Sequence, residues 1–209
     1  MEYKNKLKVC RDFLRLVFSI IFVPLYVPHY VAFLLSKSKA EIEADLSGMA
    51  KGLNFHLNHT TSLIYFLHND SYFRSLFYYR IGAIASYLIK WWRPGNATFI
   101  ISQTTKMGPG MKISHPYSTI LNAKAIGANF DCRHLTTLGN KGPDNDSRPT
   151  IGDNVFLGAA VCIIGDVVVG DNSVVGAGSV VINDIEPNSI VAGNPARLIS
   201  KIRNLGEQE

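Results

Sequence analysis

The sequence predicts an α+β protein in which a helical N-terminal region, residues 1–95, precedes a three-sided parallel β-solenoid, residues 96–209. Three observations support this prediction. An aliphatic residue recurs every six positions in the C-terminal half. A polar stretch at residues 139–150, rich in Gly, Pro, Asn and Asp, interrupts that repeat. The N-terminal half lacks the repeat and contains a long apolar run at residues 13–35.

The repeat is most regular after residue 150. There the aliphatic position is held in turn by Ile151, Leu157, Ile163, Val169, Val175 and Val181. Before residue 139 it is held by Ile101, Met107, Ile113, Ile120, Ile126, Cys132 and Leu138. A period of six fits neither a helix nor an amphipathic strand, but it fits short strands joined by turns around a triangular coil. The aliphatic residue is predicted to fill the prism, and the glycine that often follows it allows the backbone to bend.

Two breaks in the repeat indicate where a site could form. One residue is inserted around His115–Ser118, between the positions of Ile113 and Ile120. The second break, residues 139–150, is predicted to leave the prism as an extruded loop. Loops that project from a rigid scaffold are common places for binding sites.

Composition narrows the classes of partner and compartment. The net charge of +5 is not arranged as a nucleic-acid-binding stripe, so phosphorylated cofactors and anionic membrane surfaces are the expected partners. The three cysteines, Cys10, Cys132 and Cys162, show neither a disulfide framework nor zinc-ligand spacing, which favours the reducing cytoplasm. Cys132 and Cys162 are expected to be small core residues. No metal site is expected.

The apolar run at residues 13–35 predicts membrane association. It is long enough for one crossing, but Pro24 and Pro28 would break a helix near its middle. Basic residues flank both ends, which favours keeping both ends in the cytoplasm. We therefore expect a re-entrant or surface-lying helix–break–helix at the inner face of the membrane. The alternative is a helix buried at an oligomer interface.

The remainder of the N-terminal region predicts further helices. Residues 38–53 are polar and helical in composition, and residues 60–92 are rich in aromatic and basic side chains. Asp70 or Ser71 is expected to cap a helix that carries the aromatic face. This face suits a membrane interface or a cap on the first solenoid coil. Residues 94–96, Pro-Gly-Asn, are expected to mark the boundary before the solenoid.

Several motifs in residues 101–203 resemble the left-handed β-helix acyltransferases, and specifically their serine acetyltransferase-like branch. The motifs are Lys-Ile-Ser-His ending at His115, Thr-Thr-Leu-Gly ending at Gly139, Arg-Pro-Thr-Ile-Gly ending at Gly152, Gly-Ala-Gly-Ser-Val-Val ending at Val181 and Val-Ala-Gly-Asn-Pro-Ala-Arg ending at Arg197. The resemblance implies a left-handed parallel β-helix that forms a homotrimer, with acetyl-coenzyme A bound between neighbouring prisms. It also implies O-acetyl transfer to a hydroxyl-bearing small molecule or glycan.

The resemblance assigns the catalytic role to one histidine. His115 matches the general base of the family, and a near-neutral imidazole suits proton removal from an attacking hydroxyl. His134 lies one coil further on, beside the acceptor groove of the family. Ser114 and Arg148 are the other expected substrate-binding residues.

Cofactor contacts are also implied by the resemblance. The turn residues expected to meet the pantetheine amides are Gly158, Ala159, Ala177 and Gly178. Those expected to flank the adenine are Asn194, Pro195 and Arg197. Lys201 and Arg203 could pair with the phosphates, although a solvated tail is the alternative.

Departures from the family leave the acceptor open. Two family aspartates, one fifteen residues before the base and one directly before it, are replaced here by Ile100 and Ser114. The family Arg-His pair in the extruded loop is replaced by Ser147 and Arg148. Such charged groups would hold a free amino acid. We therefore favour a sugar of a surface polysaccharide precursor over L-serine, with a non-catalytic trimeric scaffold as a third possibility.

Overall fold

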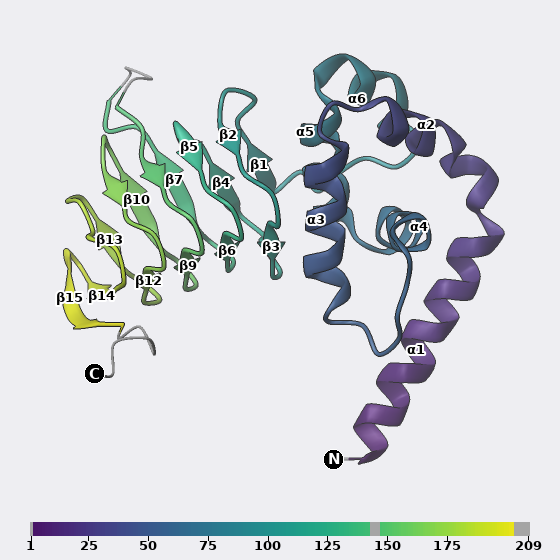
Figure 1. Cartoon of the computed structure of the whole chain (residues 1–209), viewed down its shortest axis with the longest axis horizontal. Coiled ribbons are helices and arrows are strands. Elements are labelled where there is room, and N and C mark those ends of the chain that lie inside the picture. The colour runs from purple at the N-terminus through teal and green to yellow at the C-terminus, as the bar shows by residue number, and fades with distance from the viewer. Residues whose placement is uncertain (1, 143–146, 203–209) are drawn as a thin grey trace, which may run out of the picture. The chain divides into compact units, whose positions relative to one another are not determined.

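The computed structural model describes residues 2–142 and 147–202, and it divides the chain into two compact units between Asn96 and Ala97. The first unit is helical and the second is a β-solenoid (Figure 1).

The helical unit contains the predicted break in the apolar run. Its elements are α1 (Glu2–Ile21), the 3₁₀ turn η1 (Val23–Tyr26), α2 (Val27–Leu35), α3 (Lys39–Ala50), α4 (His59–Asn69), α5 (Ser71–Ile81) and α6 (Ala83–Ile89). Pro24 lies in η1 and Pro28 lies in the first turn of α2, where a missing N–H is tolerated. Within the described residues no single helix is long and apolar enough to cross a membrane, although the pair Lys6–Ile21 and Val23–Leu35, bent by 72°, passes that test together.

Local signals explain where two of these helices begin. Asn58 caps α4, because its side-chain oxygen accepts a hydrogen bond from the Thr61 N–H. The predicted cap at Asp70 is confirmed: its carboxylate accepts from the N–H groups of Tyr72 and Phe73 at the start of α5. Gly82, with a φ of 84°, allows the chain to turn directly from α5 into α6.

A hydrophobic core holds the helices together. Its fully or nearly buried members include Tyr26, Phe33, Ile42, Leu46, Leu63, Leu67, Phe73 and Phe77. One ion pair is buried beside it: the Arg80 guanidinium donates to both carboxylate oxygens of Asp45, at 3.0 and 3.2 Å. Because both side chains are out of water, each depends on the other for its charge compensation.

The second unit is a parallel β-solenoid of about five turns. Its strands are β1 (Phe99–Ile101), β2 (Lys106–Met107), β3 (Lys112–Ile113), β4 (Thr119–Leu121), β5 (Ala125–Ile126), β6 (Asp131–Cys132), β7 (Thr137–Gly139), β8 (Thr150–Ile151), β9 (Phe156–Leu157), β10 (Cys162–Ile164), β11 (Val168–Val169), β12 (Val174–Val175), β13 (Val180–Val181), β14 (Ser189–Gly193) and β15 (Ala196–Lys201). Up to β13, every third strand joins the same sheet, so three sheets form the sides of the prism; β14 then follows β12, and β15 pairs antiparallel with β14. Their orders are β1-β4-β7-β10-β13, β11-β8-β5-β2 and β15-β14-β12-β9-β6-β3.

The solenoid core follows the predicted repeat with one correction. The aliphatic positions from Ile126 to Val181 are buried, in register from coil to coil. In β4, however, the inward residue is Leu121, 1% exposed, and not Ile120, which is 41% exposed. The reason is that the corner after β3 is lengthened while the next corner, residues 122–124, is short. Cys132 is fully buried as expected, whereas Cys162 is only half-buried because its neighbour Ile163 points inward.

Candidate active site

His115 lies on an enlarged corner of the prism. Five residues, Ser114–Ser118, connect β3 to β4, whereas four residues make the equivalent corner between β6 and β7. His115 adopts a left-handed φ of 53° and its side chain is exposed, while the next residue, Pro116, is buried. The Tyr117 N–H donates to the His115 carbonyl at 2.9 Å, which closes a tight turn. The inserted residue therefore places the His115 imidazole outside the coil, as the sequence predicted.

The same corner carries an aromatic pair. The rings of Tyr117 and His134 stack with centroids 4.9 Å apart and planes 9° from parallel. They meet because Tyr117 and His134 occupy equivalent positions in successive coils. The Tyr117 carbonyl accepts from the Leu135 N–H, and the His134 carbonyl accepts in the same way from the Ala160 N–H of the following coil. The structure thus brings His134 to the edge where His115 lies, and it adds Tyr117, which sequence reasoning missed. The sequence did contain a signal for it, because Tyr117 is an aromatic residue within the inserted segment His115–Ser118.

Ser114 and Arg133 occupy equivalent positions in successive coils at the same edge of the prism, and together they form a column along it. The Ser114 N–H donates to Cys132 O at 3.4 Å, and the Arg133 guanidinium lies 5.5 Å from the ring centroid of Phe156. Asp131 lies on β6 beside this column. Burial raises the pKa of its carboxyl, and the positive charges of Arg133 and Lys112 partly oppose that rise.

Arg148 lies at a different edge of the prism from His115. His115 connects the six-stranded sheet to the five-stranded sheet, whereas Arg148 follows β7 and connects the five-stranded sheet to the four-stranded one. The Arg148 guanidinium donates to Thr104 Oγ1 at 2.7 Å and to Asn122 Oδ1 at 3.3 Å. Within a single copy, the structure does not bring Arg148 together with Ser114, His115 and His134. Residues 143–146 of the predicted loop lie outside the described residues.

The position that carries an aspartate in the family is apolar here. Ile100 lies on β1, is half-exposed, and pairs with Ile120 of the next coil. No carboxylate therefore stands at this position to orient the His115 imidazole.

The edge that carries His134 continues into the expected cofactor residues. Tyr117, His134, Ala159 and Ala177 occupy equivalent corner positions in four successive coils. Because neighbouring strands are about 4.8 Å apart, this column spans roughly 14 Å along the prism. In the described part of the chain, the N–H groups of Ala159 and Ala177 donate to no protein acceptor. They are suitable donors for the amide carbonyls of a pantetheine arm.

The two glycines of the same turns have structural roles. The Gly158 N–H donates to Val175 O and the Gly178 N–H donates to Ala159 O, both at 2.8 Å. A Cβ on Gly158 would lie 2.6 Å from the Ala177 nitrogen, so the stacking of the coils requires glycine there. Both glycine N–H groups are used in hydrogen bonds between neighbouring coils, so of the four turn residues only the two alanines retain unused donors.

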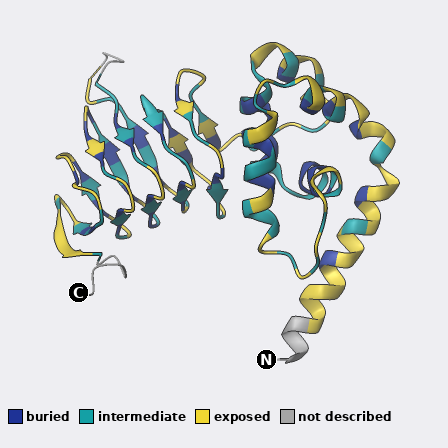
Figure 2. Ribbon diagram, in the orientation of Figure 1, coloured by how far each residue is buried: buried dark blue, intermediate teal, exposed yellow. Residues whose placement is uncertain are grey.

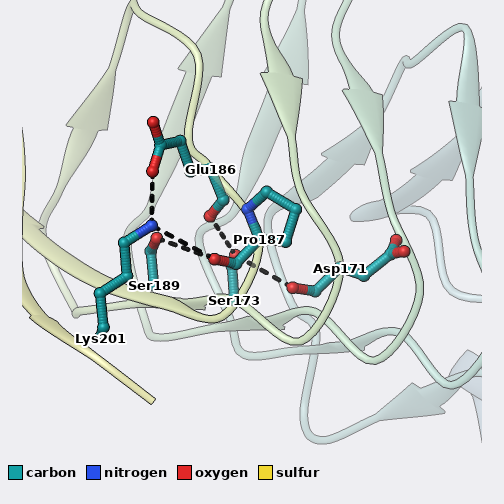
Figure 3. Close-up of polar contacts among 6 residues, drawn as sticks. All are labelled: Asp171, Ser173, Glu186, Pro187, Ser189 and Lys201. Atoms are coloured by element: carbon teal, nitrogen blue, oxygen red, sulfur yellow. Dashed lines mark hydrogen bonds and ion pairs between the residues drawn. The ribbon is translucent and has the colours of Figure 1, made fainter. Parts of the chain in front are cut away.

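The C-terminal hairpin holds the remaining expected cofactor residues. Asn194 and Pro195 join β14 to β15, and Arg197 is exposed on β15. The Lys201 ammonium donates to the Glu186 carboxylate at 2.6 Å and to Pro187 O at 3.4 Å (Figure 3). That ion pair lowers the pKa of Glu186. Lys201 already has an anionic partner that a phosphate would have to replace, and Arg203 lies outside the described residues.

In residues 2–142 and 147–202, no three His, Cys, Asp or Glu side chains gather closely enough to hold a metal ion.

Comparison with protein families and curated proteins identifies the repeat. Residues 148–183 match the family described as bacterial transferase hexapeptide (six repeats). Over 99 residues, 47% of this chain, the sequence is 41% identical to a protein of Escherichia coli K12 described as a colanic acid biosynthesis acetyltransferase, WcaB. Over 96 residues, 45% of this chain, it is 40% identical to the mitochondrial serine acetyltransferase 3 of Arabidopsis thaliana. These matches cover 61% and 25% of the two relatives.

Solved structures extend the likeness beyond the solenoid. The serine acetyltransferase of Neisseria gonorrhoeae superposes with a TM-score of 0.65 and 26% identity, over 79% of this chain and 67% of that one. The enzyme of Vibrio cholerae gives a TM-score of 0.67 at 21% identity, over 84% and 70%, which supports the fold alone. Because the solenoid is only about half of this chain, these superpositions include helical residues. The predicted resemblance to the serine acetyltransferase-like branch is confirmed.

Proposed function

We propose that this chain, whose C-terminal unit is a left-handed hexapeptide-repeat β-helix of the serine acetyltransferase-like branch, is an acetyl-coenzyme A-dependent O-acetyltransferase acting on a sugar hydroxyl. One observation carries the proposal. His115 projects from the prism edge that also presents the unused N–H donors of Ala159 and Ala177. A base and donors for a thioester-bearing arm thus occupy one edge.

The chemistry follows from that arrangement. His115 accepts the proton of the acceptor hydroxyl while its oxygen attacks the thioester carbonyl. The new ester C–O bond forms, the C–S bond breaks, and the proton passes from the imidazolium to the departing thiolate. The N–H groups of Ala159 and Ala177 hold the pantetheine arm, so that both substrates are positioned before the reaction.

The acceptor site favours a sugar over an amino acid. The stacked rings of Tyr117 and His134 offer a flat surface beside His115, and an apolar face of a sugar ring packs well on such a surface. A free amino acid needs charged partners, and Ile100 and Ser114 replace two carboxylates that the resemblance would provide. The likeness to WcaB supports a sugar of a surface polysaccharide precursor as acceptor.

L-serine is the second candidate acceptor. The likeness of both helical and solenoid parts to serine acetyltransferases supports it. In this alternative, Arg148 would pair with the serine carboxylate. The chain would then belong to cysteine biosynthesis.

We infer that a homotrimer completes the site wherever Arg148 contacts the acceptor. His115 and Arg148 lie at different edges of one prism, so both reach one acceptor only if a neighbouring copy supplies Arg148. Threefold association joins two different surfaces of the same chain, which suits this arrangement.

The proposal is tested by measuring thiol release from acetyl-coenzyme A in the presence of acceptor glycans. His115→Ala is expected to lower turnover by roughly 10²–10⁴-fold, the usual effect of losing a general base, with coenzyme A binding unchanged. His56→Ala, which changes an exposed histidine of the helical unit, is the matched control and should retain full turnover. Near-normal turnover of His115→Ala would remove this residue from the mechanism.

A further inference from the structure

Helix α1 exposes most of its large apolar side chains to solvent and buries two polar ones against its own unit. From residue 6 onward, the two α1 side chains that are fully buried are polar: Asp12 is 3% exposed and Ser19 is 0% exposed, while Leu16 is partly buried against the core. Asn54 donates to Asp12 Oδ2 at 3.2 Å and Asn69 donates to Ser19 Oγ at 2.8 Å, so α1 is attached to its unit partly through hydrogen bonds. Its exposed side chains include six large apolar ones, and Lys8, Arg11 and Arg15 are exposed with them. The apolar ones are Phe13, Leu14, Val17, Phe18, Ile20 and Ile21. A helix that packs only on its own domain shows the opposite pattern.

The neighbouring elements also expose large apolar side chains, although Phe33 of α2 is buried in the core. In α2, His29 is buried with its Nε2 3.0 Å from Tyr78 Oη, while Val27, Val31, Leu34 and Leu35 are exposed. In and after α6, Ser86 is buried, while Ile84, Tyr87, Leu88, Trp91 and Trp92 are exposed. Helix α2 packs against both η1 and α6. We call these exposed residues of α1, α2 and α6 the outer apolar face; Figure 2 shows exposed residues along these helices.

Positive charge accompanies this face. Between residues 3 and 40 the sequence contains one acidic residue, Asp12, and its buried carboxylate is paired with Arg11 at 3.1 Å. Residues 82–95 contain none. Basic residues occur in both segments, among them Lys8, Lys37 and Lys90. Apolar side chains bordered mainly by cations, with tryptophan and tyrosine among them, are typical of a helix that lies in a membrane interface.

We propose that the outer apolar face docks on an anionic lipid bilayer, with α1, η1 and α2 lying along the headgroup boundary. The 72° bend between the two halves of the apolar run fits a surface-lying arrangement. A second copy of the same face is a poorer partner, because it would bring like charges together, whereas anionic headgroups neutralise them. The proposal concerns the helical unit and does not depend on the identity of the acceptor.

The test is co-sedimentation of the full chain with phosphatidylcholine vesicles, with and without phosphatidylglycerol. The full chain is expected to bind the anionic vesicles more tightly, and added salt should weaken that binding. The triple variant Phe13→Ser, Phe18→Ser and Leu88→Ser should weaken it by at least about 100-fold, because each removes an exposed side chain that lipid would bury. The matched control, Phe13→Leu, Phe18→Leu and Leu88→Ile, keeps the face apolar and should bind normally.

A charge variant keeps the test independent of helix stability. Lys37→Gln with Lys90→Gln leaves the apolar residues unchanged and should weaken binding to anionic vesicles by about fivefold per residue. Equal binding to neutral and anionic vesicles would overturn the proposal. The proposal would also be overturned if the triple serine variant bound vesicles normally but had a lower particle mass in solution. That result would mean that a second copy of the chain covers the outer apolar face.

Discussion

The proposed site between copies predicts that two variants with lowered turnover restore activity when they are mixed. In this proposal, His115→Ala removes the catalytic base, and Arg148→Ala removes an acceptor contact that the neighbouring copy supplies. The two residues lie at opposite edges of the five-stranded sheet, so a site between copies takes one from each chain. A mixed trimer can therefore contain a site in which both residues are intact.

The size of the restored activity follows from random assembly. Alone, His115→Ala should lose roughly 10²–10⁴-fold in turnover. Arg148→Ala should lose roughly 10–100-fold, because a charged hydrogen bond is worth about 1.5–3 kcal/mol. In an equal mixture, half of the chains carry an intact His115 and half of their neighbours carry an intact Arg148. About a quarter of the sites are then complete, and activity should approach about a quarter of the unmodified value.

The assay is thiol release after the two variants are co-expressed and purified together. The matched control mixes His115→Ala with His134→Ala, because both residues lie at one edge of one copy and cannot complement. A mixture of His115→Ala and Arg148→Ala that is no more active than the mean of its parents would refute the shared site.

Three further predictions concern stability and acceptor binding. Asp45→Ala should lower the free energy of unfolding by about 3–5 kcal/mol in urea titrations, since it removes the carboxylate that pairs with the buried guanidinium of Arg80; an effect under about 1 kcal/mol would contradict the buried pair. Burial lowers the pKa of His29 to about 4, below the unfolded value of about 6.5, so the neutral form favours folding above pH 6.5 and this contribution is lost as the pH falls towards 4. His29→Phe should flatten the pH dependence of Tm in that window, and an unchanged profile would exclude this role. Tyr117→Ala should raise the KM for the acceptor about tenfold and leave the KM for acetyl-coenzyme A unchanged, whereas Tyr117→Phe keeps the stack on His134 and should behave normally.

Much of the fold could be predicted because its signals are local. The six-residue period identifies most of the buried positions of the solenoid. The carboxylate of Asp70 caps α5 by accepting hydrogen bonds from the N–H groups two and three residues later in the chain. The period could not show that Leu121, and not Ile120, points inward. The corner before β4 is longer than the regular repeat and the corner after it is shorter, so the two differences hide each other in the sequence.

The site was only partly predictable because its contacts join distant residues. The bulge at His115 is visible as an inserted residue. The stack of Tyr117 on His134 depends on how two coils align, and the separation of Arg148 from His115 depends on which corner each occupies. The polar inner side of α1 also needed the structure, because a run of apolar residues does not reveal which side chains are covered.

The most direct test of the proposed function is identification of the acetylated product. Purified chain would be incubated with radiolabelled acetyl-coenzyme A and, in parallel, with L-serine and with lipid-linked sugar precursors of surface polysaccharide. We expect label in an alkali-labile ester on the sugar, dependent on His115 and absent from His115→Ala. Label in O-acetylserine with none on any sugar would contradict the account of the acceptor, and no thiol release with either acceptor would contradict the assignment of the reaction.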